Sequence, residues 1–182
     1  MPTTIRKPWT DDELGRLPDG GRYEIDEGAL IIMAPAGRRH SNVLIQVGFL
    51  LKAFVAQHAL GEVDGGEVGV YLQRNPETLR GIDVAFFSNA KVAPMQGATG
   101  FLDVLPDLAV EVYDAAEPDL QRKVTQYLAA GIPSVWVLDP AERTLTQYRP
   151  DTEPVMLTDP DASVADPVLP GFVCRLGEFF ET

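Results

Sequence analysis

Two carboxylates in strand-like runs are the residues of this chain best suited to chemistry. Asp83 lies within GIDVAFF and Glu111 lies within LAVEVYD, and the residues around each are mostly apolar. Burying an unpaired ionised carboxylate costs several kcal/mol, so such a group becomes protonated, pairs with a cation or binds a metal. Both runs are apolar on both faces, which is typical of strands covered on both sides. We therefore expect two buried carboxylates whose charges must be compensated.

The alternation of a strand decides which side chains share a face. In GIDVAFF, Ile82, Val84 and Phe86 share one face. Asp83 lies on the other, and in LAVEVYD the valines lie opposite Glu111. If the strands are neighbours, the two carboxylates can converge, and a divalent cation between them would remove the repulsion of like charges. Hard oxygen ligands of this kind suit Mg²⁺.

A lysine in the next segment completes a set of three. Leu120, Val124, Tyr127 and Leu128 are spaced as the apolar stripe of a helix, and Lys123 lies at its edge. From there the lysine can reach over the sheet toward the second acid. It would orient a water molecule or stabilise charge that develops on a phosphoryl oxygen.

Structural roles are open for each of these residues. Asp83 is also explained as a satisfied strand-end residue near the turn at Arg80. Glu111 is also explained by an ion pair with Lys123 or Arg122. The lysine could simply lay its stem on apolar surface and keep its charge in water.

The remaining pattern predicts the elements that must position these groups. Thr10 to Glu13 form a capping box that opens a short helix, which Asp19-Gly20-Gly21 breaks. RYEID and ALIIMAP predict a hairpin. Helical spacing runs from about residue 40 to 60, and three strands follow, EVGVYLQ, GIDVAFF and LAVEVYD.

Pro118 then opens the helix that carries the lysine, and Gly131 and Pro133 close it. SVWVLD predicts a strand, and TLTQY completes a second hairpin. The order from residue 40 to 139 is α-β-β-β-α-β, and we expect an α/β (α+β) mixed sheet with helices on its faces. The proline-rich residues 151–182 favour an irregular surface segment that returns to the body of the domain at LPGFVCRLGEFF.

Length, composition and charge limit the function. The 182 residues fit one domain, 1–182, and no apolar run of about 18 residues predicts a membrane span. The N-terminus lacks an apolar signal core, so we expect a cytoplasmic protein. The net charge of −12 argues against a broad, non-specific nucleic-acid surface. One cysteine, Cys174, excludes an intrachain disulfide and a cysteine zinc site, and its apolar neighbours favour a buried structural thiol.

Several of these stretches resemble the Uma2 family (DUF820), restriction-endonuclease-like proteins of the PD-(D/E)XK nuclease superfamily. They are YEIDEGALIIMAP, RRHSNVLIQV, GIDVAFFSNA, LAVEVYD and DLQRKVTQYLAAGIPSVWVLDP. The resemblance covers about residues 20–150, and its most specific part is the run from Lys123 to Asp139. It implies the superfamily core, α-β-β-β-α-β, with an added N-terminal and C-terminal hairpin.

The resemblance also implies roles for particular residues. Asp83 and Glu111 match the two motif acids, and Lys123 matches a lysine that usually stands two residues after the second acid, where this chain has Tyr113. Mg²⁺ or Mn²⁺ would bind both acids and the backbone carbonyl of Val112.

Two further positions, His40 and Glu24, match residues that recur near the site of the family. A helix-start polar residue and a solvated strand residue are their alternatives.

The implied activity is metal-dependent endonucleolytic hydrolysis of phosphodiester bonds, with DNA as the expected partner. Arg38 and Arg39 could contact phosphates or simply be solvated charges at a helix start. Homodimerisation through a hairpin or the C-terminal segment is also open. The alternative is a catalytically silent binding or regulatory module on a nuclease fold, which the −12 charge favours.

Overall fold

The computed structural model describes residues 9, 11–14, 16–17, 22–114 and 119–181, and an eight-stranded mixed sheet forms its centre. The strands of this sheet are β1 (Arg22–Asp26), β2 (Ala29–Met33), β3 (Gly61–Arg74), β4 (Glu77–Ser88), β5 (Leu108–Val112), β6 (Ser134–Asp139), β7 (Thr144–Tyr148) and β8 (Val155–Leu157). They are arranged β2-β1-β4-β5-β6-β7-β8, and β3 pairs with β4. The β5–β6 pair is parallel and the other pairs are antiparallel.

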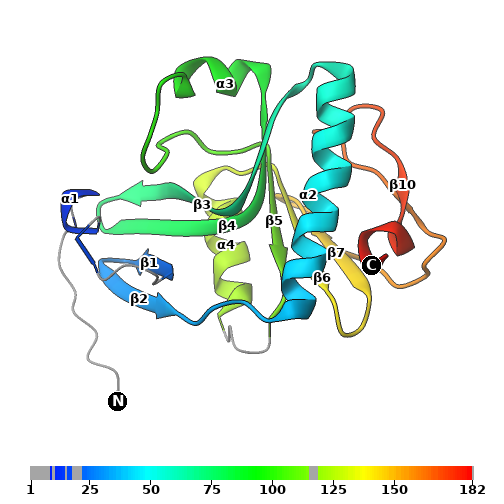
Figure 1. Cartoon of the computed structure of the whole chain (residues 1–182), viewed down its shortest axis with the longest axis horizontal. Coiled ribbons are helices and arrows are strands. Elements are labelled where there is room, and N and C mark those ends of the chain that lie inside the picture. Colours follow the sequence, from blue (N-terminus) through cyan, green and yellow to red (C-terminus); the bar gives the residue numbers. More distant parts are fainter. Residues whose placement is uncertain (1–8, 10, 15, 18–21, 115–118, 182) are drawn as a thin grey trace.

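Two helices cover the sheet on opposite faces. In Figure 1, α2 (Arg38–His58) crosses the front of the sheet and α4 (Leu120–Ala130) lies behind it. The predicted order α-β-β-β-α-β is confirmed as α2, β3, β4, β5, α4 and β6, and both predicted hairpins are present. The loop after β4 contains one further short helix, α3 (Asn89–Met95), which the sequence pattern did not predict because Pro94 lies inside it.

Each helix buries one apolar stripe against the sheet. Val43, Val47, Leu51 and Val55 of α2 recur every four residues, as a helix face requires, and pack against β4 to β7. The stripe of α4 packs against the opposite face of β4 to β6. No helix in the described ranges is long and apolar enough to cross a bilayer.

The helix boundaries follow the expected signals where the structure describes them. Gly131 ends α4 in the left-handed conformation, with φ of 107°, as the sequence predicts. Helix α1 (Asp11–Leu14) lies where a short N-terminal helix is expected. The capping residue Thr10, the break at residues 19–21 and the helix-opening Pro118 lie outside the described residues.

The C-terminal segment returns to the body of the domain at residues 169–180 as predicted, but it is more ordered than an irregular segment, and Val164 is already buried before that point. It contains the short strands β9 (Ser163–Val164) and β10 (Cys174–Arg175) and the 3₁₀ helix η1 (Leu176–Phe180). Its apolar residues complete the core on the α2 side, and they are Val164, Leu169, Phe172, Leu176, Phe179 and Phe180. The prolines prevent long elements but do not prevent burial, since this segment covers Trp136 and Leu145 of the sheet.

A buried carboxylate, Asp166, joins this segment to the sheet. Its Oδ2 accepts hydrogen bonds from Ser134 Oγ at 2.6 Å and Trp136 Nε1 at 2.9 Å, and it pairs with Arg149 at 3.0 Å. The other oxygen accepts the backbone N–H of Val168. One side chain thus satisfies two donors of β6 and the Arg149 side chain that follows β7, and it closes the C-terminal turn.

We expect Asp166→Ala to lower the free energy of unfolding by about 3 kcal/mol, because it leaves buried donors and the Arg149 charge without an acceptor. Asp161→Ala is the control, since that carboxylate is 78% exposed and its loss should change stability by less than about 0.5 kcal/mol. Urea denaturation followed by tryptophan fluorescence measures both. A loss of under about 1 kcal/mol for Asp166→Ala would contradict this account.

The single thiol should react slowly. Burial, aided by the charge of Glu178, raises the pKa of Cys174 to about 12. Because the thiolate is the reactive form, alkylation at pH 8 should be at least about 100-fold slower in the folded protein than in urea. Mass spectrometry of timed iodoacetamide reactions measures this, and equal rates in the two states would refute it.

Candidate active site

The site lies at a gap along one edge of β4. On that edge β5 pairs with residues 84–86 and β1 pairs at Leu79, so the edge between these contacts faces neither strand. Side chains pair with the backbone in the gap. Gly81 N–H donates to Glu24 Oε1 at 3.1 Å, and Gly81 C=O accepts from Lys123 Nζ at 3.3 Å. This pairing is required because buried backbone groups are costly to leave unsatisfied.

Lys123 is the cation at the centre of this gap. Its Nζ lies 3.1 Å from Glu24 Oε1 and 3.1 Å from Glu111 Oε2, and all three side chains are buried. The predicted helix position therefore does bring the lysine to Glu111. The structural ion pair that was one alternative is also present, and it does not exclude a catalytic role.

Two further side chains fix the carboxylates beside Lys123. Tyr127 O–H donates to Glu111 Oε1 at 2.6 Å, and Arg80 pairs with Glu24 Oε2 at 2.8 Å. Burial, together with the negative charge of Glu111, raises the pKa of Tyr127 well above its usual value, so the phenol remains a donor. Both oxygens of each glutamate therefore have partners.

Asp83 is held separately, from the α2 side. Its Oδ2 accepts the backbone N–H of Val112 at 2.8 Å and lies 3.0 Å from His40 Nε2. Burial would raise the pKa of Asp83, but His40, the Val112 N–H and Lys123 together lower it, so the group is ionised. Its second oxygen, Oδ1, is buried and has no hydrogen-bond partner among the residues that the structure describes.

His40 lies in the first turn of α2, and its side chain is buried. Burial opposes its protonation, but the hydrogen bond to Asp83 and the charge of that carboxylate raise the pKa of His40 above its usual value. The imidazolium and the carboxylate thus stabilise each other. Arg38 and Arg39, just before it, are exposed on the first turn of the helix.

A β-bulge adds another carboxylate to this region. The β3–β4 register shifts between Gly65 and Val68, so Gly66 and Glu67 stand opposite Asp83. Glu67 has a φ of 69°, in the left-handed region. Burial and the charge of Asp83 raise the pKa of Glu67 to about 7.

The strand alternation expected for β4 is wrong at this point. Val84 and Phe86 pack on the α2 side as predicted, but Ile82 packs in the core cluster on the α4 side. The bulge and the gap in pairing distort the strand here, and Asp83 reaches toward α2 while Glu111 contacts α4.

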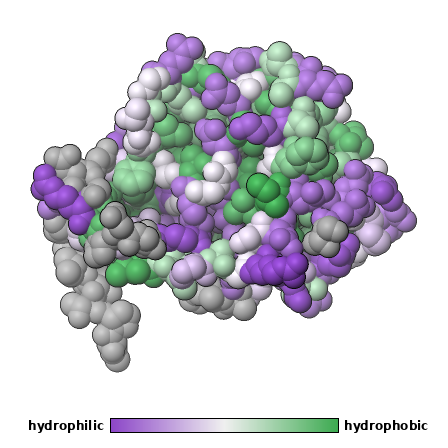
Figure 2. All heavy atoms as spheres, viewed as in Figure 1, coloured by the Kyte–Doolittle hydropathy of each residue, from purple (hydrophilic) through white to green (hydrophobic). Residues whose placement is uncertain are grey.

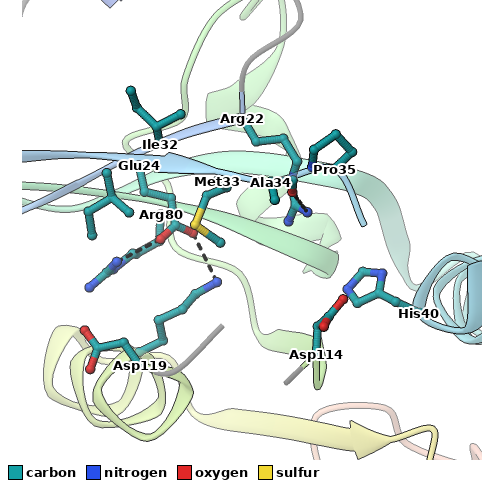
Figure 3. A pocket seen from close by; sticks show the side chains of 12 residues that line it. Arg22, Glu24, Ile32, Met33, Ala34, Pro35, His40, Arg80, Asp114 and Asp119 are labelled. Carbon is teal, nitrogen blue, oxygen red and sulfur yellow. Dashed lines mark hydrogen bonds and ion pairs between the residues drawn. The ribbon is translucent and has the colours of Figure 1, made fainter. Parts of the chain in front are cut away.

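The gap opens into a pocket of about 410 Å³. Figure 3 shows Arg22, Glu24 and Arg80 projecting from the strands on one side and His40 and Asp114 on the other. Lys123 and Asp119 also line the pocket. Apolar residues of β2 and the residues after it complete the wall, and they are Ile31, Ile32, Met33, Ala34 and Pro35. On the face shown in Figure 2, polar and apolar residues are interspersed.

The residues fit a divalent cation at one point. A buried carboxylate oxygen without a donor, Asp83 Oδ1, is a suitable hard ligand. Within the described ranges no three His, Cys, Asp or Glu side chains converge as a metal-binding group. A site of one or two carboxylates completed by water and a carbonyl, which is how Mg²⁺ is commonly held, needs fewer side chains than that.

All five acid, lysine and histidine residues expected from the sequence lie in this region. Asp83, Glu111, Lys123, Glu24 and His40 are each at most 5% exposed. The solvated alternative for Glu24 is therefore wrong.

Other residues contribute to the site and were not predicted as site residues, and they are Arg80, Gln126, Tyr127, Arg22 and Glu67. Gln126 accepts from the Arg80 guanidinium at 2.6 Å. The one available signal for Glu67 was the preceding Gly65-Gly66, because glycine inside a strand pattern often marks a bulge.

Comparison with known proteins places this architecture in a class. A solved structure described as "a putative nuclease belonging to DUF820", from Anabaena variabilis ATCC 29413, is similar with a TM-score of 0.80 and 21% identity. The alignment covers 95% of this chain and 98% of that chain. The mixed sheet with a helix on each face is therefore a nuclease fold. No curated protein gave a significant match.

The sequence also matches a family model, described as "Uma2: Putative restriction endonuclease", over residues 11–177. The chain belongs to the Uma2 family, so family and fold together indicate a nuclease of the restriction-endonuclease type.

Removing the ammonium group of Lys123 should destabilise the fold. We expect Lys123→Met to lower the free energy of unfolding by about 3 kcal/mol, because it leaves buried carboxylates without their cation. The matched control on the same helix is Arg122→Met, whose exposed ion pairs should contribute less than about 1 kcal/mol. Chemical denaturation at pH 7 measures both, and equal stability of the two variants would contradict the assigned role of Lys123.

Proposed function

We propose that this protein is a divalent-metal-dependent endonuclease that hydrolyses phosphodiester bonds of DNA. The observation that carries the proposal is the gap on β4, where Asp83, Glu111 and Lys123 come together beside an open pocket. Family membership and fold support the reaction class. The metal and the DNA substrate are inferences from the chemistry of the site.

Asp83, Glu111 and the backbone carbonyl of Val112 are the proposed ligands of Mg²⁺ or Mn²⁺. When bound, such an ion lowers the pKa of a coordinated water and polarises the scissile phosphate. His40 keeps Asp83 oriented by its 3.0 Å contact, and the Val112 N–H fixes the same oxygen. The free Oδ1 then points its lone pairs where no protein donor competes.

Lys123 acts as an ammonium ion in this proposal. Two carboxylates and a carbonyl accept from it, which suits a charged donor better than a neutral base. Because these three acceptors take its three N–H donors, its proposed role is electrostatic, and its charge stabilises negative charge that develops on the phosphoryl oxygens. Glu24 and Arg80 hold it from one side, as Tyr127 holds Glu111 from the other.

The hydrolysis itself follows from these roles. The water oxygen bonds to phosphorus, the bond from phosphorus to the 3′ oxygen breaks, and the products carry a 5′-phosphate and a 3′-hydroxyl. The pocket of about 410 Å³ is large enough for a phosphate of a DNA strand and the groups next to it. Arg22 lines that pocket, and Arg38 and Arg39 are the proposed contacts to neighbouring phosphates.

Cleavage of supercoiled plasmid and of single-stranded DNA with Mg²⁺ or Mn²⁺ tests the proposal. We expect Asp83→Asn, Glu111→Gln and Lys123→Met each to reduce the rate at least about 100-fold, because each removes a group that acts on the reacting phosphate. Asp103→Asn, an exposed carboxylate paired with Arg74, should leave the rate unchanged.

Two results would refute the proposal. Equal rates for all variants would reveal a contaminating nuclease. No cleavage of DNA by wild type with either metal would favour a catalytically silent binding module, and cleavage of RNA alone would correct the substrate.

A further inference from the structure

Glu67 is a carboxylate for which the sequence pattern and the family motif give no role. It lies in the β3 bulge, directly opposite Asp83. Its carboxyl group is close enough to that of Asp83 to form a hydrogen bond with it when one of the two carries a proton. The two acids therefore come from adjacent strands and meet at the gap.

The partners of the two carboxylates differ in a way that leaves one position open. Arg22 binds Glu67 Oε1. The other oxygen, Oε2, is turned toward Gly81, where a Cβ would lie only 2.5 Å from it. Asp83 is 2% exposed, and its Oδ1 has no hydrogen-bond partner among the described residues.

The other proposed acid ligand is less free. Both oxygens of Glu111 are engaged, one by Tyr127 at 2.6 Å and one by Lys123 at 3.1 Å. A cation that binds Asp83 Oδ1 in this arrangement therefore has a less engaged carboxylate available on β3 than on β5. Mg²⁺ and Mn²⁺ are suited to a site of two carboxylates with several waters.

The local backbone is built around this placement. Glu67 is a non-glycine residue with φ of 69°, although two glycines precede it and would adopt that conformation at lower cost. Gly81 leaves the space that the Glu67 carboxylate occupies. A conformation that costs energy is kept where the side chain is needed.

We propose that Glu67 is a ligand of the divalent cation, paired with Asp83 across the β3 bulge. This inference rests on the proposed metal dependence and adds a residue to it. A purely structural role for Glu67 would consist of its ion pair with Arg22, and the experiment must separate the two.

Calorimetric titration of the metal-free protein with Mn²⁺ provides the main test. We expect Glu67→Gln to weaken Mn²⁺ binding at least about tenfold, as loss of a ligand should. Glu62→Gln, an exposed glutamate on the same strand, should bind as wild type. Gly81→Ala keeps both acids but displaces the Glu67 carboxylate, so it should weaken binding as well.

Thermal unfolding without metal gives an independent readout and shows that each variant folds. Because Glu67→Gln removes repulsion from Asp83, its melting temperature without metal should equal or exceed that of wild type. Adding Mn²⁺ should raise the melting temperature of wild type and raise that of Glu67→Gln by less. A lower melting temperature without metal and unchanged Mn²⁺ affinity would show that Glu67 only pairs with Arg22.

The outcomes distinguish this inference from the proposed function. Unchanged affinity in Glu67→Gln with lost affinity in Glu111→Gln would overturn the inference and leave the nuclease proposal standing. Lost affinity in Glu67→Gln alone supports the inference and removes Glu111 from the ligands. No Mn²⁺ binding by wild type would overturn the inference and the metal dependence together.

Discussion

The site depends on one constraint. The buried backbone N–H and C=O groups of β4 between its contacts with β1 and β5 must find hydrogen-bond partners. No strand supplies the missing backbone partners there, so Glu24 accepts the Gly81 N–H and Lys123 donates to its carbonyl. Charged side chains therefore make the hydrogen bonds that a neighbouring strand would otherwise make. Because a buried charge needs a counter-charge, this choice determines much of what surrounds the gap.

Two connected sets of contacts surround the gap, and they differ in whether every carboxylate oxygen has a partner. The first runs from Arg80 through Glu24, Lys123 and Glu111 to Tyr127, and the oxygens of both glutamates in it have partners. The second joins His40 and the Val112 N–H to one oxygen of Asp83 and stops at the other oxygen. The first set therefore supports the fold and positions the lysine. The second set holds a carboxylate with one oxygen free for a ligand.

The parts of this arrangement that the sequence predicts are those set by regular periodicity. Lys123 was located because α4 keeps a helical period, and Glu111 because β5 alternates regularly. Asp83 was recognised as a buried acid, but the faces of its neighbours were misassigned, since Ile82 lies next to a bulge in the paired strand.

Other features depend on contacts between distant segments and leave no local pattern. Arg80 and Gln126 meet only because β1, β4 and α4 come together. The C-terminal apolar residues have neither a helical nor a strand period, because prolines interrupt the segment. Their burial follows from the sheet surface that they cover, of which Trp136 is the largest side chain. Asp166 likewise becomes an anchor only once that surface is formed.

Two energetic costs, at Asp83 and at Glu67, bear on whether the protein is an enzyme or a silent binding module. A buried oxygen without a partner costs roughly 1–3 kcal/mol, and a non-glycine residue with positive φ costs roughly 1–2 kcal/mol more. Asp83 and Glu67 carry these costs on facing strands, and their contacts with the Val112 N–H, His40 and Arg22 do not relieve them. A module that only binds a partner through its surface would gain nothing from them. A bound cation would offset both of these costs. It would also neutralise carboxylates that are counted in the net charge of −12. The net charge therefore does not argue against a nucleic-acid substrate at this gap.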